Sequence, residues 1–173
     1  MTRLALASLA LAAGCASTPR MKTVDRVDLP RFMGDWYVLA HIPASLEKDA
    51  YQGVESYRLD DDGSIATTYT FRDGGFDGPA KRYTPRGFVR DRTTHAEWGM
   101  RFIWPFRSEY LVVHLDEGYT ETIIGRSKRD LVWIMARTPE VPAADYERLV
   151  RKVQELGYDV GKLRKVPQVR PPG

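Results

Sequence analysis

The sequence predicts an all-β protein, either a β-sandwich or an up-and-down β-barrel, with a single α-helix packed on its outside. Strand-like runs follow one another between residues 36 and 136, and short polar or glycine-containing turns separate them. Within several runs, large apolar side chains alternate with smaller or more polar ones, as in strands with one buried face. After these runs, one segment has the period of an amphipathic helix. The 173 residues are enough for one domain with its own core.

Eight runs have the composition of strands. We expect them at residues 36–42, 54–59, 65–72, 81–91, 96–103, 109–115, 120–125 and 131–136. In the third run, one face carries Ile65, Tyr69 and Phe71 with a threonine among them. The sixth and eighth runs are apolar on both faces, which predicts that another layer covers their outer side.

The segment 142–157 can supply this layer as a helix. Pro142 suits the first turn and Gly157 suits the stop. Between them, apolar residues recur at the spacing of one helical stripe: Tyr146, Leu149, Val150, Val153 and Leu156. We expect this stripe to pack on the sheet as part of the core.

The first fourteen residues have the composition of a secretory signal peptide. One arginine precedes a run of leucine and alanine that ends in small residues. The run is shorter than the roughly 18 residues that a membrane-spanning helix needs. Cys15 follows at once, and it is the only cysteine in the chain, so it cannot form an internal disulfide.

The stretch "LAAGC" resembles a bacterial lipoprotein signal, in which the cysteine is acylated and becomes the mature N-terminus. The resemblance implies a palmitate-type anchor on Cys15 and a polar tether over residues 15–28. Because Ala16 is not acidic, it also implies the outer membrane, with the protein facing the periplasm. Ala12 departs from the pattern, since leucine is commonest there. The alternative is an incidental thiol in a signal peptide that is cut elsewhere.

Three further stretches resemble the lipocalin family. "GDWY", after the helical turn "DLPRFM", resembles the lipocalin G-x-W signature, and "WIMARTP" resembles the last lipocalin motif. In "LDEGY" only Asp116 matches the family's T-D-Y. "YRLDDDGSI", "FIWPF" and "LVWIMARTP" are similar to bacterial outer-membrane lipocalins, which are apolipoprotein D-like. The resemblance implies an eight-stranded antiparallel up-and-down barrel with one helix outside, over residues 29–168, and a tail over 169–173.

The same resemblance assigns structural roles to three residues. The indole of Trp36 should lie at the closed base of the barrel, with the guanidinium of Arg137 across its face. Gly34 should let the backbone pass close to a neighbouring turn. These residues identify the fold and are not expected to bind the ligand.

A lipocalin barrel has room for one small apolar ligand, such as a fatty acid or a lysophospholipid with its tail buried and its head at the mouth. The family register and the alternation from Trp36 predict these ligand-binding residues: Val38, Ala40, Tyr57, Thr67, Tyr69, Phe71, Trp98, Met100, Phe102, Tyr110, Val112, Ile123, Trp133 and Met135. The same register turns further residues inward: Ile42, Ile65, Leu131, Glu55 and Glu121. An inward carboxylate would need a cation, water or a place near the mouth. The alternative is that these residues only fill a solid core.

Other functions find little support in the sequence. The three histidines, His41, His95 and His114, lack metal-site spacing, and no nucleophile elbow or phosphate-binding loop is present. The net charge of +3 is spread along the chain without a nucleic-acid motif. We therefore expect no enzyme activity, catalytic residue, metal or cofactor.

The first expectation is a membrane-anchored lipocalin that stores or transports a lipid in the cell envelope. A lipid-processing enzyme on the same barrel and a structural envelope protein with a filled barrel are the alternatives. The sequence is compatible with a homodimer. The "WPF" stretch is either a hairpin tip packed on a neighbouring loop, a lid, or a surface that touches a membrane or a partner.

Overall fold

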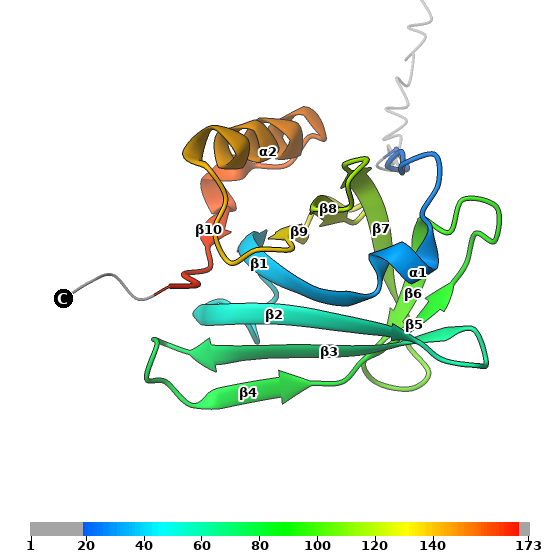
Figure 1. Ribbon diagram of the computed structural model, residues 1–173, viewed down its shortest axis with the longest axis horizontal. Helices are drawn as coiled ribbons and strands as arrows, with labels where there is room; N and C mark the ends of the chain where they lie inside the picture. The colour runs from blue at the N-terminus through cyan, green and yellow to red at the C-terminus, as the bar shows by residue number, and fades with distance from the viewer. Residues whose placement is uncertain (1–18, 170–173) are drawn as a thin grey trace, which may run out of the picture.

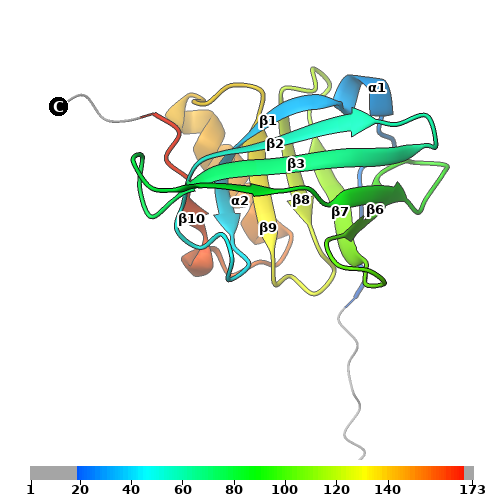
Figure 2. The ribbon, with the colours of Figure 1, turned by 90° about the horizontal axis from the view of Figure 1, so that it is seen from below.

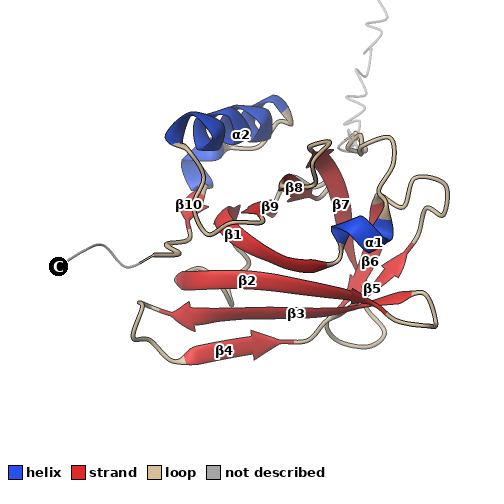
Figure 3. Ribbon diagram, viewed as in Figure 1, coloured by secondary structure: helices blue, strands red, loops and turns tan. Residues whose placement is uncertain are grey.

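The computed structural model describes residues 19–169. The predicted signal peptide, Cys15 and residues 170–173 of the predicted tail lie outside this range. The helical segments are α1 (Leu29–Phe32), α2 (Ala143–Glu155) and the 3₁₀ turn η1 (Val160–Lys162). The strands are β1 (Gly34–Ile42), β2 (Ala50–Leu59), β3 (Ser64–Asp73), β4 (Ala80–Tyr83), β5 (Arg86–Val89), β6 (Glu97–Arg101), β7 (Ser108–Leu115), β8 (Glu121–Gly125), β9 (Val132–Ala136) and β10 (Arg164–Lys165). Figures 1 and 3 show their arrangement. No helix between residues 19 and 169 is both long and apolar enough to cross a bilayer.

The strands form one antiparallel sheet that closes on itself. Its order is β1-β2-β3-β5-β6-β7-β8-β9, and β9 pairs again with β1. β4 extends the sheet beside β3, and the short β10 pairs with β1. The predicted run 81–91 is split into β4 and β5 around Pro85, which has no N–H to donate to a ladder. Counted as one interrupted strand, these two complete the predicted eight-stranded barrel.

Buried side chains form two cores. The inner core fills much of the barrel and is rich in aromatic rings, including Phe32, Trp36 and Trp98. The outer core lies between the barrel wall and α2, where Leu149 and Val153 are fully buried. The predicted helix and its packing role are thus confirmed, and Figure 1 shows α2 on the outside of the barrel.

Register shifts interrupt three strand pairs, that of β2 with β3 between Tyr51 and Val54 among them, and the other two concern residues that were predicted to face inward. The pairing of β1 with β9 shifts between Val38 and Ala40, and that of β7 with β8 shifts between Val112 and His114. Such bulges interrupt the strict alternation of a strand, so residues beyond them turn to the opposite face from the one that counting predicts.

The closed end of the barrel is built on the predicted contact between Arg137 and Trp36. The guanidinium carbon lies 3.9 Å from the centre of the indole ring system. The same guanidinium donates hydrogen bonds to the backbone carbonyls of Arg31, Phe32, Met33, Asp35 and Tyr119. The indole N–H of Trp36 donates to the Phe32 carbonyl over 2.8 Å. One arginine therefore fixes α1, the start of β1 and the turn before β8.

Gly34 lies next to the guanidinium of Arg137 at this end. Its φ is +92°, and a Cβ there would lie 3.4 Å from Nη1 of Arg137. A side chain would suffer mainly from the backbone conformation, which favours glycine. Glycine thus serves the positive φ at this position, and the nearest atom to an added Cβ belongs to the Arg137 side chain and not to a neighbouring turn as predicted.

The segment predicted as a polar tether is, from residue 19 onward, a strap packed on the barrel. Met21 and Val27 are buried. The backbone N–H of Val24 donates to the Val112 carbonyl over 2.9 Å, and that of Val27 donates to the Thr94 carbonyl over 2.7 Å. The strap thus runs along the barrel wall toward α1.

Candidate ligand cavity

A cavity of about 280 Å³ occupies the end of the barrel opposite α1. The loop that joins β1 to β2 and the loop that joins β6 to β7 both contribute to its lining. Figure 2 shows α1 at one end of the barrel and the β1–β2 loop at the other. The lining residues are Ala44, Leu46, Glu47, Glu55, Thr67, Tyr69, Tyr83, Pro85, Met100, Phe102, Ser108, Glu109, Tyr110, Leu131 and Trp133. Most are apolar or aromatic, as in pockets that hold small ligands.

The predicted ligand-binding residues fall into three groups. The first group lines the cavity: Thr67, Tyr69, Met100, Phe102, Tyr110 and Trp133, with Leu131 beside them. The second lies in the inner core without lining the cavity: Val38, Tyr57, Phe71, Trp98, Val112 and Met135. The third faces away from the interior: Ala40 and Ile123, together with Ile42. The prediction that these last three face inward is wrong.

The bulges explain the wrong assignments. Beyond the shift in β1, Ala40 and Ile42 belong to the outer core under α2. In β7, Val112 pairs with Ile124 before the shift and both face inward, whereas beyond the shift His114 pairs with Ile123, which lies on the outside. A bulge depends on the paired strand, so alternation within one strand does not reveal it.

Glu121, which the register turned inward, and His114 both lie on the outside of the barrel. Glu121 bonds to Arg148 of α2 over 2.6 Å, so the prediction of an inward Glu121 is wrong. His114 pairs with Ile123 on the outer face, and burial together with Lys152 and Arg148 lowers its pKa to about 4. His114 therefore belongs to the contact between the barrel and α2.

Glu55 faces inward as predicted, but without a cation. It is only 7% exposed, and the nearest polar partner is the hydroxyl of Tyr110, which donates to it over 3.4 Å. Tyr110 is also hydrogen-bonded to Tyr57. Burial, reinforced by the charge of Glu47, raises the pKa of Glu55 to about 8. At neutral pH its carboxyl group is therefore mainly protonated in the ligand-free protein.

Glu47 reaches the cavity from the β1–β2 loop, where sequence reasoning did not place a functional residue. It is 7% exposed, and its carboxylate accepts a hydrogen bond from the backbone N–H of Ala44 over 3.1 Å. Burial raises the pKa of Glu47, while the hydrogen bond from the Ala44 N–H opposes this shift, as does the nearby indole N–H of Trp133, whose geometry falls short of a hydrogen bond. The loop thus brings a second carboxyl group close to the first.

His41 lies behind Glu47 but does not neutralise it. Nδ1 of His41 is 3.9 Å from the carboxylate, beyond hydrogen-bonding distance, and burial lowers the pKa of His41 to about 4. The histidine is therefore neutral at neutral pH. Three buried polar atoms of this region have no hydrogen-bond partner among residues 19–169: Nδ1 of His41, the hydroxyl of Tyr69 and Nε1 of Trp133.

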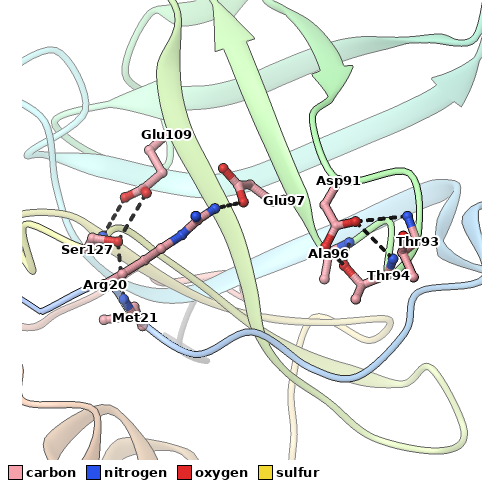
Figure 4. Close-up of polar contacts among 9 residues, drawn as sticks. All are labelled: Arg20, Met21, Asp91, Thr93, Thr94, Ala96, Glu97, Glu109 and Ser127. Carbon is pink, nitrogen blue, oxygen red and sulfur yellow. Dashed lines mark hydrogen bonds and ion pairs between the residues drawn. The ribbon is translucent and has the colours of Figure 1, made fainter.

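The cavity combines aromatic walls with unusual charge. Its lining contains three carboxyl groups, from Glu47, Glu55 and Glu109, and no lysine, arginine or histidine among the described residues that form it. Glu109 accepts hydrogen bonds from the N–H and hydroxyl of Ser127 (Figure 4). Within residues 19–169, no three side chains come together that could hold a metal ion.

Apolar side chains surround the mouth. Between β6 and β7, Phe102 is 63% exposed and Trp104 is 78% exposed, and Ile103 and Phe106 are also exposed. Leu46 is exposed on the facing β1–β2 loop. β6 ends at Arg101, so Phe102 lines the mouth from a loop and not from the predicted strand.

Comparison with known proteins agrees with this architecture. The lipocalin-like domain family matches residues 27–168. Temperature-induced lipocalin-1 of Arabidopsis thaliana is 30% identical over 160 residues, with 86% of this chain and 83% of that protein covered. The outer membrane lipoprotein Blc of Escherichia coli K12 is 28% identical over 174 residues, with 94% and 92% covered. Insecticyanin from the tobacco hornworm Manduca sexta superposes with a TM-score of 0.65 at 15% identity, covering 87% of this chain and 85% of that one. The chain belongs to the lipocalin family.

Proposed function

We propose that the protein binds a single-chain amphiphile in the open half of its barrel and stores or transports it in the cell envelope. The observation that carries this proposal is the cavity of about 280 Å³, closed by aromatic packing at one end and open at the other. Its volume is near the lower end of the about 300–1,000 Å³ typical of ligand pockets. Such a site suits one narrow chain better than a bulky ring system.

The names of two relatives support a place at the membrane. The relative from E. coli is named an outer membrane lipoprotein, as is a relative from Vibrio cholerae. In this chain, Cys15 would carry the acyl chains, each of whose buried methylenes adds about 0.8 kcal/mol to membrane binding. The protein would then be anchored to the outer membrane on its periplasmic side.

The strap also supports an orientation for the anchored barrel. The described chain begins at the mouth: the carbonyl of Pro19 accepts a hydrogen bond from Arg129, and the N–H of Met21 donates to Ser127 (Figure 4). Cys15 is four residues before Pro19, so the anchor would lie within about 14 Å of it. The exposed rings around the mouth would then face the bilayer, where aromatic side chains are favourable.

Lipid extraction tests the binding proposal. The protein should be purified without added lipid, and its organic extract analysed by mass spectrometry beside a mock purification from cells that lack it. We expect a single-chain amphiphile at close to one molecule per protein. A folded protein whose extract matches the mock extract would contradict the proposal.

The anchor is tested separately with Cys15→Ala. We expect the wild-type protein to fractionate with membranes and the variant to become soluble in the periplasm, because the acyl chains are lost. Mass spectrometry of the mature wild-type N-terminus gives the decisive result. An unacylated N-terminus would refute the anchor while leaving the barrel's ligand binding untouched.

A further inference from the structure

The inner part of the cavity holds two carboxyl groups that nothing in the described protein neutralises. Glu47 and Glu55 are each 7% exposed, and the cavity lining contributes no basic side chain from residues 19–169. The third carboxyl, that of Glu109, already has the N–H and hydroxyl of Ser127 as donors. Burying an ionised carboxyl group without a cation is unfavourable, so burial favours the neutral acid here and leaves the site able to ionise beside a positively charged partner.

A second observation points to the same partner. The hydroxyl of Tyr69 lines the cavity and makes no hydrogen bond to residues 19–169, although Tyr69 is only 6% exposed. Glu55 pairs with Tyr69 across β2 and β3, and Glu47 lines the same cavity, where the charges of both glutamates raise the pKa of Tyr69. Three side chains with oxygen atoms that can accept hydrogen bonds, those of Glu47, Glu55 and Tyr69, therefore line the same cavity.

The walls of the cavity favour a cation over any other polar group. Tyr69, Tyr83, Tyr110 and Trp133 line it, and Phe102 lies at the mouth. The faces of aromatic rings attract ammonium groups, most strongly where water is excluded. A primary ammonium has three N–H donors, one for each of the side chains of the two inner glutamates and Tyr69.

We propose that the cavity binds a primary alkylammonium amphiphile head first, with the ammonium between Glu47, Glu55 and Tyr69 and the alkyl chain directed toward the apolar mouth. This inference rests on the proposed binding of an amphiphile in the barrel. It reverses the orientation expected from the sequence, in which the head lies at the mouth. It also disfavours a fatty acid once Glu47 or Glu55 is ionised, because like charges would then repel.

Proton release should accompany binding. In the ligand-free protein burial and Glu47 raise the pKa of Glu55 to about 8, whereas a bound ammonium favours the ionised carboxylate. The other titratable groups around Glu55 are Glu47 from the β1–β2 loop, Tyr69 from β3, and Tyr110 from β7 with Tyr57 behind it. Burial raises the pKa values of Tyr69 and Tyr110, so neither ionises near neutrality, and His41 beside Glu47 is neutral. The affinity for an ammonium should therefore rise with pH up to about 8, by at most about tenfold per pH unit for one linked proton.

Three probes with the same ten-carbon chain test the proposal: decylammonium, 1-decanol and decanoate. Their affinities for the full chain should be measured by isothermal titration calorimetry between pH 6 and pH 8. We expect decylammonium to bind most tightly and to gain affinity as the pH rises. Decanol should show little dependence on pH, and decanoate should bind most weakly and lose affinity as Glu55 ionises.

A matched pair of variants locates the effect. Glu55→Gln keeps the shape of the side chain but removes its charge, and should weaken decylammonium binding by roughly 10–100-fold, the value of a charged hydrogen bond, while sparing decanol. Glu117→Gln, an exposed residue of the β7–β8 turn, should change neither affinity. Tighter binding of decanoate than decylammonium at pH 8, or unchanged decylammonium binding in Glu55→Gln, would overturn the head-first ammonium while leaving the proposed cavity function intact. If none of the three probes binds the folded protein, both proposals are wrong.

Discussion

At the closed end of the barrel, the guanidinium of Arg137 donates to five backbone carbonyls, whereas at the open end the hydroxyl of Tyr69 and the indole N–H of Trp133 have no partner among residues 19–169. The closed end is also filled: the Phe32 ring centre lies 5.0 Å from that of Trp36 and 5.4 Å from that of Trp98. The open end holds the cavity.

The contrast separates stability from binding within one barrel. Buried polar groups with partners stabilise a fold, while those without partners destabilise it unless a ligand completes them. We therefore expect the closed half to contribute most of the free energy of folding. The open half has fewer packing contacts and hydrogen bonds because it contains the ligand site. Variants of matched residues in the two halves can test this division.

The largest expected difference concerns two tryptophans. Trp36 is fully buried at the closed end, so Trp36→Ala should lower the free energy of unfolding by about 3–5 kcal/mol. Trp133 already borders a cavity and is partly exposed, so Trp133→Ala should lower it by clearly less, about 1–2 kcal/mol. Urea denaturation of both variants measures the difference. Equal losses would mean that the open half contributes as much to folding as the closed half.

The acid in the open half should make stability depend on pH. The pKa of Glu55 is about 8 in the folded protein and near its ordinary value in the unfolded protein. As the pH rises, the carboxyl group therefore loses its proton at a lower pH in the unfolded state than in the folded state. This raised pKa makes the folded state progressively less favourable as the pH rises from about 5 to 8, by roughly 3 kcal/mol at pH 7. We expect Glu55→Gln to remove most of this loss and to be more stable than the wild type at pH 7. Parallel stability–pH curves for the two proteins would show that Glu55 is not the cause.

A smaller effect should appear at the closed end as coupling between Arg137 and Trp36. Their cation–π contact at 3.9 Å is shared, so Arg137→Ala and Trp36→Ala should together cost less than the sum of the two single changes. We expect a coupling of about 0.5–2 kcal/mol in a double-mutant cycle of unfolding free energies. Strict additivity would contradict the stacked pair.

The sequence predicted the closed half far better than the open half, for a physical reason. Gly34, Trp36 and Arg137 lie in short motifs that resemble those of a family, and the helix stripe has a period that is visible in one segment. These features are local. The strands were also predicted from their composition, except that Pro85 divides the fourth run into two.

The open half depends on relations between strands, which a single sequence does not display. The bulge between Val38 and Ala40 turns His41 toward Glu47 and turns Ala40 to the outer core. Glu47 enters the cavity because its loop folds over the mouth, and nothing in "ASLEKD" signals this. The inward direction of Glu55 followed from alternation, but its lack of a cation is visible only once the barrel has closed.

The central claim is that the cavity in the open half is the place where the ligand binds, and a space-filling variant tests it most directly. Thr67 lines the cavity, and the neighbouring Thr68 faces the other side of β3, where it pairs with Ser56. The affinity of a fluorescent alkyl probe should be measured for Thr67→Phe and for Thr68→Phe, with circular dichroism to show that both variants keep their strands. We predict that Thr67→Phe abolishes binding, because the ring occupies the space of the chain, and that Thr68→Phe binds as the wild type does. Wild-type affinity in a folded Thr67→Phe would contradict the claim and move the ligand outside the barrel.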